Sequence, residues 1–310
     1  MMVLEMIGDA IKHKTDWNKA LSPETILLLA LRLYASGSML ITVGDFCGVS
    51  KSTACRAVQV VSHHIALLRD RFIKFPATQE ERIKLREQFY KIARFPRVVG
   101  ALDCTHVRIV SPGGENAEIF RNRKGFFSMN VQTLCDPDLK ITDIVARWPG
   151  STHDSTIFNN SVIRARFESG VIDDGSVIIG DSGYPNRPYL ITPLAAPDSP
   201  EEQLFNESQI RTRNCVERSY GVWKRRFPIL STGIRLHHNK VQSIVVATAV
   251  LHNICCLNND MNLPVLEPHI ENAVHVVNNV PNARETQNFN NSVRNAIIYD
   301  HFKNLRQIQG

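Results

Sequence analysis

The sequence has 310 residues, of which 43% are hydrophobic and 21% are charged. This length and composition allow one large folded domain beside a smaller helical one, and they exclude a disordered chain. The formal net charge of +6 favours an acidic partner. Nucleic acid is the commonest such partner, although many mildly basic proteins bind no polyanion.

Seven cysteines are scattered along the chain without a Cys-x-x-Cys pair. Their odd number and wide spacing argue against a disulfide framework and against a zinc site. The amino terminus lacks a cleavable signal pattern, and the longest apolar run, Ile244 to Leu257, is interrupted by His252 and Asn253. We therefore expect a protein of the reducing cell interior, in the cytoplasm or nucleus, with no membrane segment.

Residues 1–70 are predicted to form a helical region. Ser22 and Pro23 supply an N-cap and a first-turn proline for a strongly apolar helix that ends at Gly37. A short helix, a glycine-containing turn and a helix capped by Ser50 follow. This second unit has the layout of a helix-turn-helix.

The helix after Ser50 has the pattern of a DNA-recognition helix. Ala54, Val58 and Val61 lie at i, i+4 and i+7, so they predict a buried face. The opposite face then presents small polar and basic groups that could meet phosphates or base edges. These groups are Lys51, Ser52 and Arg56. The same spacing occurs in plain helical bundles, so a structural role is the alternative.

Residues 71–97 are highly charged and are predicted to form a connecting helix. Its apolar side chains Ile83, Phe89 and Ile92 are expected to pack against a core, with a solvated charged face opposite.

Residues 98–257 are predicted to form an α/β catalytic domain around a mixed sheet. Three strands come first, and the Asp-Pro-Asp turn between the second and third predicts a hairpin. A helix capped near Ser151 or Thr152 leads to a buried strand at 177–180. Ligands gather at the carboxyl ends of the parallel strands in such sheets. Residues 258–310 are rich in asparagine and are expected to pack loosely, except for a final helix at 292–305.

Three carboxylates are placed where a metal site could form. The segment Val98 to His106 leads apolar residues directly to Asp103, and Asp181 follows Val-Ile-Ile-Gly in the same manner. A carboxylate at the edge of a core is costly unless it is paired, hydrogen-bonded or bound to a cation. Glu217 lies at the border of the apolar stripe of a basic helix that is predicted to start after Asn206.

Asp103, Asp181 and Glu217 together predict a site for Mg²⁺ or Mn²⁺, since these hard cations prefer oxygen ligands. Such ions carry out phosphodiester chemistry. Asp154 either stabilises the start of its helix or joins the site. The basic residues of the Glu217 helix are expected to contact the DNA backbone. They are Lys224, Arg225 and Arg226.

Each of these residues also has an ordinary structural interpretation. Asp181 could belong to a turn, Glu217 could form a surface ion pair with Arg213, and His106 could be a core histidine. The chain contains no P-loop motif and no Gly-x-Ser-x-Gly elbow, so the sequence supports neither nucleotide hydrolysis through a P-loop nor a serine triad.

Five motifs resemble, in the same order, those of DDE transposases of the PIF/Harbinger superfamily and of the animal nucleases derived from them. The motifs are G-A-L-D-C-T-H, N-R-K-G-F-F-S-M-N, W-P-G-S-T-H-D-S, G-D-S-G-Y-P and V-E-R-S-Y-G-V-W-K-R-R-F. The resemblance spans residues 21–257. It implies an RNase H-like catalytic fold, divalent-metal nuclease activity and a nuclear role.

The resemblance also implies roles for individual residues. The two aspartates and the glutamate of the family match Asp103, Asp181 and Glu217, and Asp154 matches a further, accessory aspartate. Harbinger-type elements resemble two-component systems, so we expect DNA and a Myb/SANT-like DNA-binding protein as partners, and a location in both nucleus and cytoplasm. The alternative to a nuclease is a DNA-binding or scaffolding protein that keeps the triad without turnover.

Overall fold

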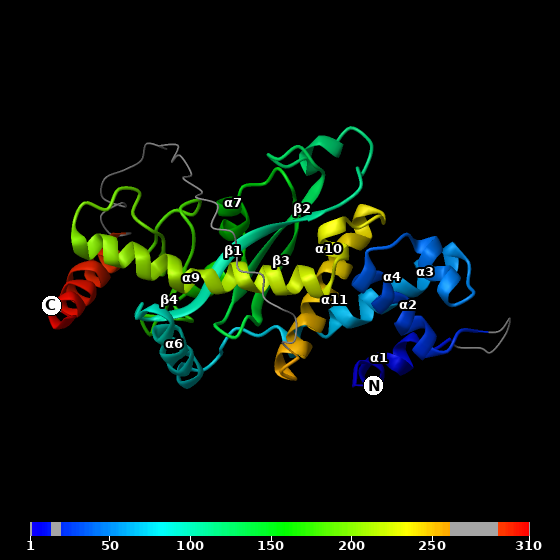
Figure 1. Ribbon diagram of the computed structural model, residues 1–310, viewed down its shortest axis with the longest axis horizontal. Coiled ribbons are helices and arrows are strands. Elements are labelled where there is room, and N and C mark those ends of the chain that lie inside the picture. Colours follow the sequence, from blue (N-terminus) through cyan, green and yellow to red (C-terminus); the bar gives the residue numbers. More distant parts are fainter. Residues whose placement is uncertain (1, 14–19, 261–290, 310) are drawn as a thin grey trace.

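The computed structural model describes residues 2–13, 20–260 and 291–309. A group of helices from the amino-terminal part lies at one end of an elongated molecule, and a sheet flanked by further helices forms the rest (Figure 1). The helices before the sheet are α1 (Met2–Ile11), α2 (Pro23–Ser36), α3 (Leu40–Phe46), α4 (Lys51–Leu67), α5 (Arg69–Phe72) and α6 (Gln79–Ala93). The first of them, α1, lies within the predicted helical region, although no separate helix was predicted at its start.

The predicted ends of α2 are confirmed. The Ser22 hydroxyl accepts a hydrogen bond from the Thr25 backbone, and Pro23 is the first helical residue. Gly37 ends the helix with φ of 61°, in the left-handed region that favours glycine. A Cβ at Gly37 would lie 2.1 Å from the Thr232 hydroxyl. Two separate features therefore require glycine at position 37: the left-handed backbone conformation and the closeness of Thr232.

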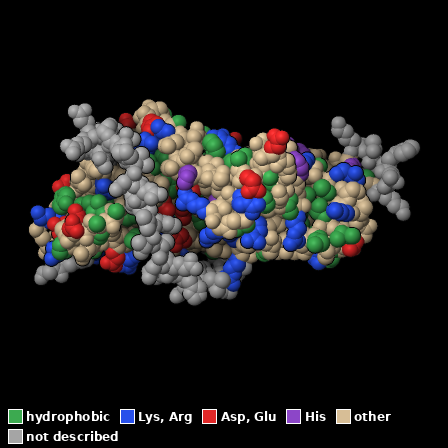
Figure 2. Space-filling view, turned by 90° about the horizontal axis from the view of Figure 1, so that it is seen from above, with side chains coloured by type: hydrophobic (Ala, Val, Ile, Leu, Met, Phe, Trp, Pro, Cys, Tyr) green, Lys and Arg blue, Asp and Glu red, His purple; other side chains and the backbone are tan. Residues whose placement is uncertain are grey.

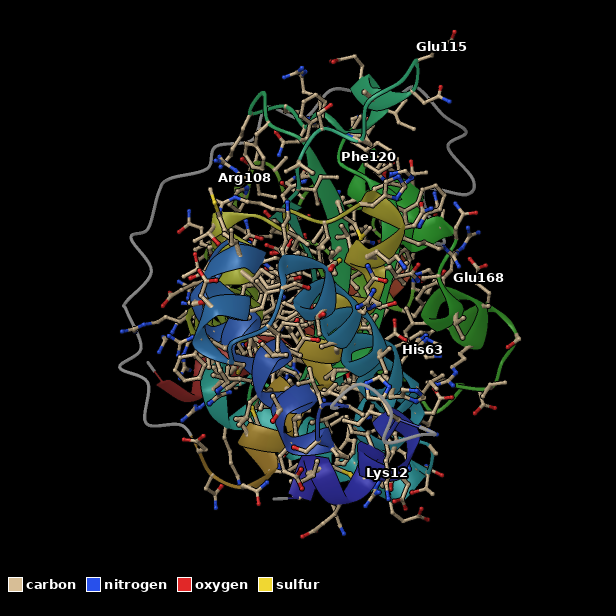
Figure 3. All side chains as sticks on the ribbon, turned by 90° about the vertical axis from the view of Figure 1, so that its right-hand side faces the viewer. Lys12, His63, Arg108, Glu115, Phe120 and Glu168 are labelled. Atoms are coloured by element: carbon tan, nitrogen blue, oxygen red, sulfur yellow. The ribbon has the colours of Figure 1, made fainter. Side chains whose placement is uncertain are left out.

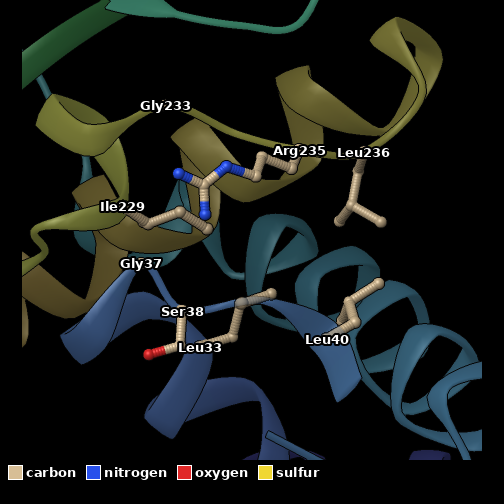
Figure 4. A pocket seen from close by; sticks show the side chains of 8 residues that line it. All are labelled: Leu33, Gly37, Ser38, Leu40, Ile229, Gly233, Arg235 and Leu236. Atoms are coloured by element: carbon tan, nitrogen blue, oxygen red, sulfur yellow. The ribbon is translucent and has the colours of Figure 1, made fainter. Parts of the chain in front are cut away.

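The same place marks where the helical region meets the rest of the protein. A pocket lies between α2 and the segment that follows α10 (Ile229–Thr232), and Figure 4 shows its mainly apolar lining. The residues of this lining are Leu33, Gly37, Ser38, Leu40, Ile229, Gly233, Arg235 and Leu236. The helical region is thus packed directly against the part of the chain that carries the sheet.

Helix α4 has the predicted orientation. Ser50 caps it by accepting a hydrogen bond from the Thr53 backbone. Ala54, Val58 and Val61 are fully buried, whereas Lys51, Ser52 and Arg56 are exposed. The predicted polar face of this helix therefore reaches solvent.

One side chain of the connecting helix was assigned to the wrong face. Helix α6 buries Arg82, Leu85 and Phe89, while Ile83 is 42% exposed. Because residues 82, 85 and 89 share one face, position 83 is turned away by one helical step. The buried guanidinium of Arg82 is paired with Asp174, at 2.7 Å between Nε and Oδ2.

A five-stranded mixed sheet lies at the centre of the remaining chain. β1 is antiparallel to β2, β2 is antiparallel to β3, and β1, β4 and β5 run parallel. The strand order is β3-β2-β1-β4-β5, so the central strand β1 is the one that carries Asp103. The predicted mixed sheet and its hairpin are confirmed. The strands are β1 (Val98–Arg108), β2 (Ser128–Cys135), β3 (Ile141–Pro149), β4 (Val177–Ile179) and β5 (Leu190–Ile191).

The segment between β1 and β2 extends beyond the sheet (Figure 3). It contains a short 3-10 helix, η1 (Ala117–Phe120), and Glu115 lies at its outer end in the same view. The single helix predicted between β3 and β4 is two helices, α7 (Asp154–Asn159) and α8 (Val162–Glu168). They are separated because Ser161 accepts a hydrogen bond from the Arg164 backbone and so starts a new helix.

Helix α9 (Pro200–Arg226) crosses the sheet and contacts both β1 and β2 (Figure 1). Its predicted start after Asn206 was wrong. The helix begins at Pro200 because Ser199 and Glu202 form a capping box, which was not recognised in the sequence. The predicted apolar stripe of this helix is buried, and its members are Val216, Tyr220, Trp223 and Phe227.

Helix α11 (His238–Leu257) packs against α4 on one side and β3 on the other. It is long and apolar enough to cross a membrane by composition, but most of it is buried within the protein. Its polar residues bind the turn between β2 and β3. The His252 Nε2 lies 2.8 Å from the Leu139 carbonyl, and the Asn253 amide exchanges hydrogen bonds of 2.7 and 2.8 Å with the backbone of Ile141.

The predicted final helix is also present. Residues 291–296 are helical, and η2 (Ile297–Phe302), a π-helical turn, and α13 (Lys303–Gln309) continue it. Phe302 is fully buried against Phe95 and Phe205, so this carboxyl-terminal segment packs onto the sheet domain. The loosely packed stretch expected at 261–290 lies outside the described residues.

The buried pair of Arg82 and Asp174 predicts a stability difference between neighbouring residues of α6. Arg82→Met should reduce the free energy of unfolding by about 1–3 kcal/mol, because the buried Asp174 carboxylate then keeps only one of its two ion pairs, that with Arg86 at 2.7 Å. Ile83→Ala should change it by no more than about 0.5 kcal/mol, since that side chain is largely in solvent. Urea denaturation of both variants measures the difference, and equal losses would contradict the assignment.

Candidate active site

Asp103 lies in the middle of β1, just beyond the stretch that pairs with β4, and not at the strand end as predicted, whereas Asp181 lies two residues beyond the end of β4. β1 pairs with β4 so that Ala101 lies opposite Ile179, and each aspartate follows two residues later. The strand register therefore brings both carboxylates to one edge of the sheet. In agreement, the charge of Asp181 raises the pKa of Asp103.

The backbone around Asp103 is held in place by hydrogen bonds. Its Oδ1 accepts a hydrogen bond of 2.8 Å from the Cys104 backbone, and its carbonyl accepts one of 2.7 Å from the Tyr220 hydroxyl. The Tyr220 hydroxyl in turn accepts a hydrogen bond from Thr133 on β2. The apolar stripe of α9 thus positions a tyrosine that ties this helix to the aspartate.

Asp103 carries a carboxyl group that is costly to ionise. Burial, together with the charges of Asp181 and Asp154, raises the pKa of Asp103 to about 7, although Arg213 and the Cys104 backbone hydrogen bond act in the opposite direction. The site therefore has an excess of negative charge in a partly buried position, which a further cation would relieve.

Arg213 connects Asp103 with Glu217. Its Nη1 lies 3.4 Å from Asp103 Oδ2, and its Nη2 lies 2.6 Å from Glu217 Oε1. The Glu217 side chain is 40% exposed, so the ion pair expected in the ordinary interpretation of this residue is present. Among the residues that the structure describes, no three His, Cys, Asp or Glu side chains are grouped closely enough to hold a metal ion.

Asp154 is the first residue of α7 and lies near Asp103. Its Oδ1 accepts a hydrogen bond of 2.8 Å from Asn130 on β2, whose amide also binds the Thr152 carbonyl at 2.9 Å. Asn130 therefore fixes the start of α7 against the sheet. Since the charge of Asp154 acts on Asp103, this carboxylate both starts a helix and belongs to the same charged cluster.

Lys224 lies beside the carboxylates instead of pointing freely into solvent. Its Nζ donates hydrogen bonds of 2.6 Å to the Thr105 hydroxyl and 3.1 Å to the His106 carbonyl. Burial lowers the pKa of Lys224 to about 8, and the positive charge of Lys124 acts in the same direction. Burial also lowers the pKa of His106 despite the opposing charge of Asp154, and three nearby cations lower it further: Lys224, Lys124 and Arg123.

The other basic residues predicted to bind DNA have different surroundings. Arg226 binds His252 at 3.3 Å and the Asp260 carbonyl, and Arg225 is partly buried. Lys51, Ser52 and Arg56 lie on α4, within the helical end of the molecule and apart from the carboxylates on the sheet (Figure 1).

Sequence reasoning missed three residues of this site. Arg123 and Lys124 belong to the N-R-K-G-F-F motif, which was recognised without a role for its cations. Arg213 was considered only as a surface partner of Glu217. Its position four residues before Glu217 on a helix was the available signal, because residues at i and i+4 face each other.

The donor atoms at this edge are of the kind that a hard divalent cation binds, although the described side chains are not grouped closely enough to hold one. Asp103, Asp181, Glu217 and Asp154 offer carboxylate oxygens, which Mg²⁺ and Mn²⁺ prefer. Burial is the main cause of the raised pKa of Asp103, and the charges of Asp181 and Asp154 add to it.

The chain is similar to known proteins over most of its length. Residues 102–253 match the family described as DDE superfamily endonuclease. The human protein named "Putative nuclease HARBI1" is 34% identical over 255 residues, which cover 81% of this chain and 72% of that protein. The Xenopus laevis protein of the same name is 29% identical over 283 residues, covering 88% and 80%.

A plant protein is also similar. "Protein ALP1-like" of Arabidopsis thaliana is 27% identical over 259 residues, covering 78% of this chain and 63% of that protein. No solved structure matches the chain. The five-stranded mixed sheet corresponds to the RNase H-like fold of DDE endonucleases. The chain therefore belongs to the Harbinger-derived nuclease family of the DDE endonuclease superfamily.

Proposed function

We propose that this protein is a divalent-metal-dependent nuclease of transposase origin that acts on the phosphodiester bonds of DNA. The observation that carries the proposal is the register of β1 and β4, which places Asp103 and Asp181 side by side at one sheet edge. Asp154 and Glu217 lie around the same edge and complete a set of oxygen donors.

A group of cations beside these carboxylates supports a phosphate-containing substrate. The charges of these cations lower the pKa of one another or of His106. None of the three forms an ion pair with a carboxylate among the described residues. They are Lys224, Lys124 and Arg123. Keeping like charges together costs free energy unless an anion joins them. Figure 2 shows Lys and Arg side chains gathered near the middle of one face of the molecule.

The chain's own residues have distinct tasks in such a reaction. Asp103, Asp181 and Glu217 would hold the metal, with Asp154 as a further donor, and Tyr220 keeps the Asp103 backbone in place. The bound metal would polarise the phosphate and activate the attacking water or hydroxyl. Lys224 and Lys124 would orient phosphate oxygens by charge and hydrogen bonding.

The alternative function is a DNA-binding or scaffolding protein without turnover. The observation that favours it is the ion pair between Arg213 and Glu217, because a glutamate held by an arginine is not free to ligate a metal. One nuclease assay separates the two functions.

Asp103→Asn should reduce the rate of DNA cleavage roughly 100-fold or more, since it removes one ligand charge from the metal site. The measurement is cleavage of several DNA forms with Mg²⁺ or Mn²⁺. Asp173→Asn, at an exposed aspartate, is the control and should retain the rate. Absence of metal-dependent cleavage by the unchanged protein, or an undiminished rate in Asp103→Asn, would favour the silent alternative.

We also propose that α4 contacts DNA phosphates through Lys51 and Arg56. Reversing both charges should weaken DNA binding and flatten the dependence of log Kd on log salt by about two slope units, because about one counterion is released per phosphate contact. Reversing Lys84 and Lys303, which are also exposed, provides the control. An unchanged slope in the α4 variant, with folding intact, would reduce this helix to a structural element.

A Myb/SANT-like DNA-binding partner is proposed for site choice and nuclear entry, with the chain shared between nucleus and cytoplasm. Supporting this, α4 offers a short basic surface, and specific sites need several base contacts. The basic run at 224–226 is a poor import signal, because Lys224 and Arg226 are bound within the fold.

Expressing the chain without its partner tests this proposal. We expect weak nuclear accumulation and little sequence preference in a binding assay with competitor DNA, and both should increase when the partner is co-expressed. Strong nuclear accumulation together with tight, site-specific binding by the chain alone would refute the need for a partner.

A further inference from the structure

Arg213 occupies the position between two of the proposed metal ligands. One end of its guanidinium faces Asp103 at 3.4 Å, and the other end faces Glu217 at 2.6 Å. The charge of Asp181 also acts on Arg213. The single guanidinium of Arg213 thus interacts electrostatically with all three carboxylates of the triad.

This arrangement accounts for the lack of a closed group of metal ligands in the described part of the chain. A carboxylate oxygen that accepts a hydrogen bond from a guanidinium at 2.6 Å is directed toward that nitrogen. A metal ion between Asp103 and Glu217 would claim the same oxygens and would be repelled by the guanidinium. Arginine cannot relieve the conflict by losing its proton, because its pKa is too high.

Solvent reaches the site of Arg213 from the side of Glu217. Its side chain is only 15% exposed, but its partner Glu217 is 40% exposed and opens the site to solvent. The side chain is long and unbranched, and it starts one helical turn from Glu217 on the rigid helix α9. A rotation of this side chain that broke both contacts would release both carboxylates without a movement of α9.

We propose that Arg213 is an internal counter-ion, which stabilises the crowded carboxylates in the metal-free protein and must be displaced from Asp103 and Glu217 when the divalent metal binds. This inference rests on the proposed function, since it concerns the same site. Arg213 is thereby a positioning residue that sets how strongly the site binds metal.

Metal binding without DNA tests the inference. Arg213→Gln should bind Mn²⁺ at least tenfold more tightly than the unchanged protein in calorimetric titration with MnCl₂, because no guanidinium has to leave. The variant should melt at a lower temperature in EDTA and gain more from added Mn²⁺, because its carboxylates then lack a counter-ion. Affinity equal to or weaker than that of the unchanged protein would overturn the inference.

Two further variants keep the test sharp. Arg211→Gln is the matched control, since Arg211 pairs with Glu207 at i,i+4 on the same helix, at 3.3 Å and exposed to solvent. It should leave both the melting temperature and the Mn²⁺ affinity unchanged. Arg213→Lys retains the charge without the two-ended geometry, so its affinity should be intermediate. If Arg213→Gln fails to fold without metal, an unchanged affinity in Arg213→Lys overturns the inference.

The substitution Asp103→Asn, made both in the unchanged protein and in Arg213→Gln, distinguishes failure of the proposed metal site from failure of the counter-ion inference. The measurement is again the affinity for Mn²⁺. If Mn²⁺ binding depends on Asp103 but is equally tight with and without Arg213, only the counter-ion inference fails. If neither protein binds Mn²⁺ through Asp103, the metal site fails, and the counter-ion inference fails with it.

Discussion

The parallel pairing of β1 and β4 is the contact on which the site depends. β1 is the central strand, hydrogen-bonded to β2 on one side and to β4 on the other, so its register fixes both neighbours. The pairing of Ala101 with Ile179 sets the relative position of Asp103 and Asp181 along the two strands. Gly100 is needed for this packing, because a Cβ there would lie 2.7 Å from Leu134. A small residue in the core, three positions before Asp103 and opposite Ile178 of β4, therefore helps to place both carboxylates.

Much of this arrangement was readable from the sequence, because buried strands and amphipathic helices leave strong patterns. The apolar runs before Asp103 and Asp181 predicted the sheet edge, and the stripe of α9 predicted which face of that helix is buried. Local signals were less decisive. The start of α9 depended on a capping box at Ser199, and the face of Ile83 depended on a buried arginine one residue before it.

The direction of the Glu217 side chain could not be predicted. Helical spacing places Arg213 near it, but the same spacing fits a metal ligand, a surface ion pair or both in turn. Whether Glu217 faces a metal ion or Arg213 depends on the total charge at the sheet edge. That charge includes Asp154 and Asp181, which come from distant parts of the chain. A sequence pattern reveals neither the summed charge of these carboxylates nor the burial that strengthens their electrostatic interactions.

Helix α11 joins the two ends of the molecule, since it is held to β3 through Asn253 and packs along α4 on its other side. The close contact of Gly37 with Thr232 adds a second attachment. If the protein is a nuclease whose α4 binds DNA, these two rigid attachments would fix the distance between the DNA segment that α4 binds and the phosphodiester bond that is cut. The dimensions of the protein, and not the base sequence around the cleaved bond, would then determine the position of the cut.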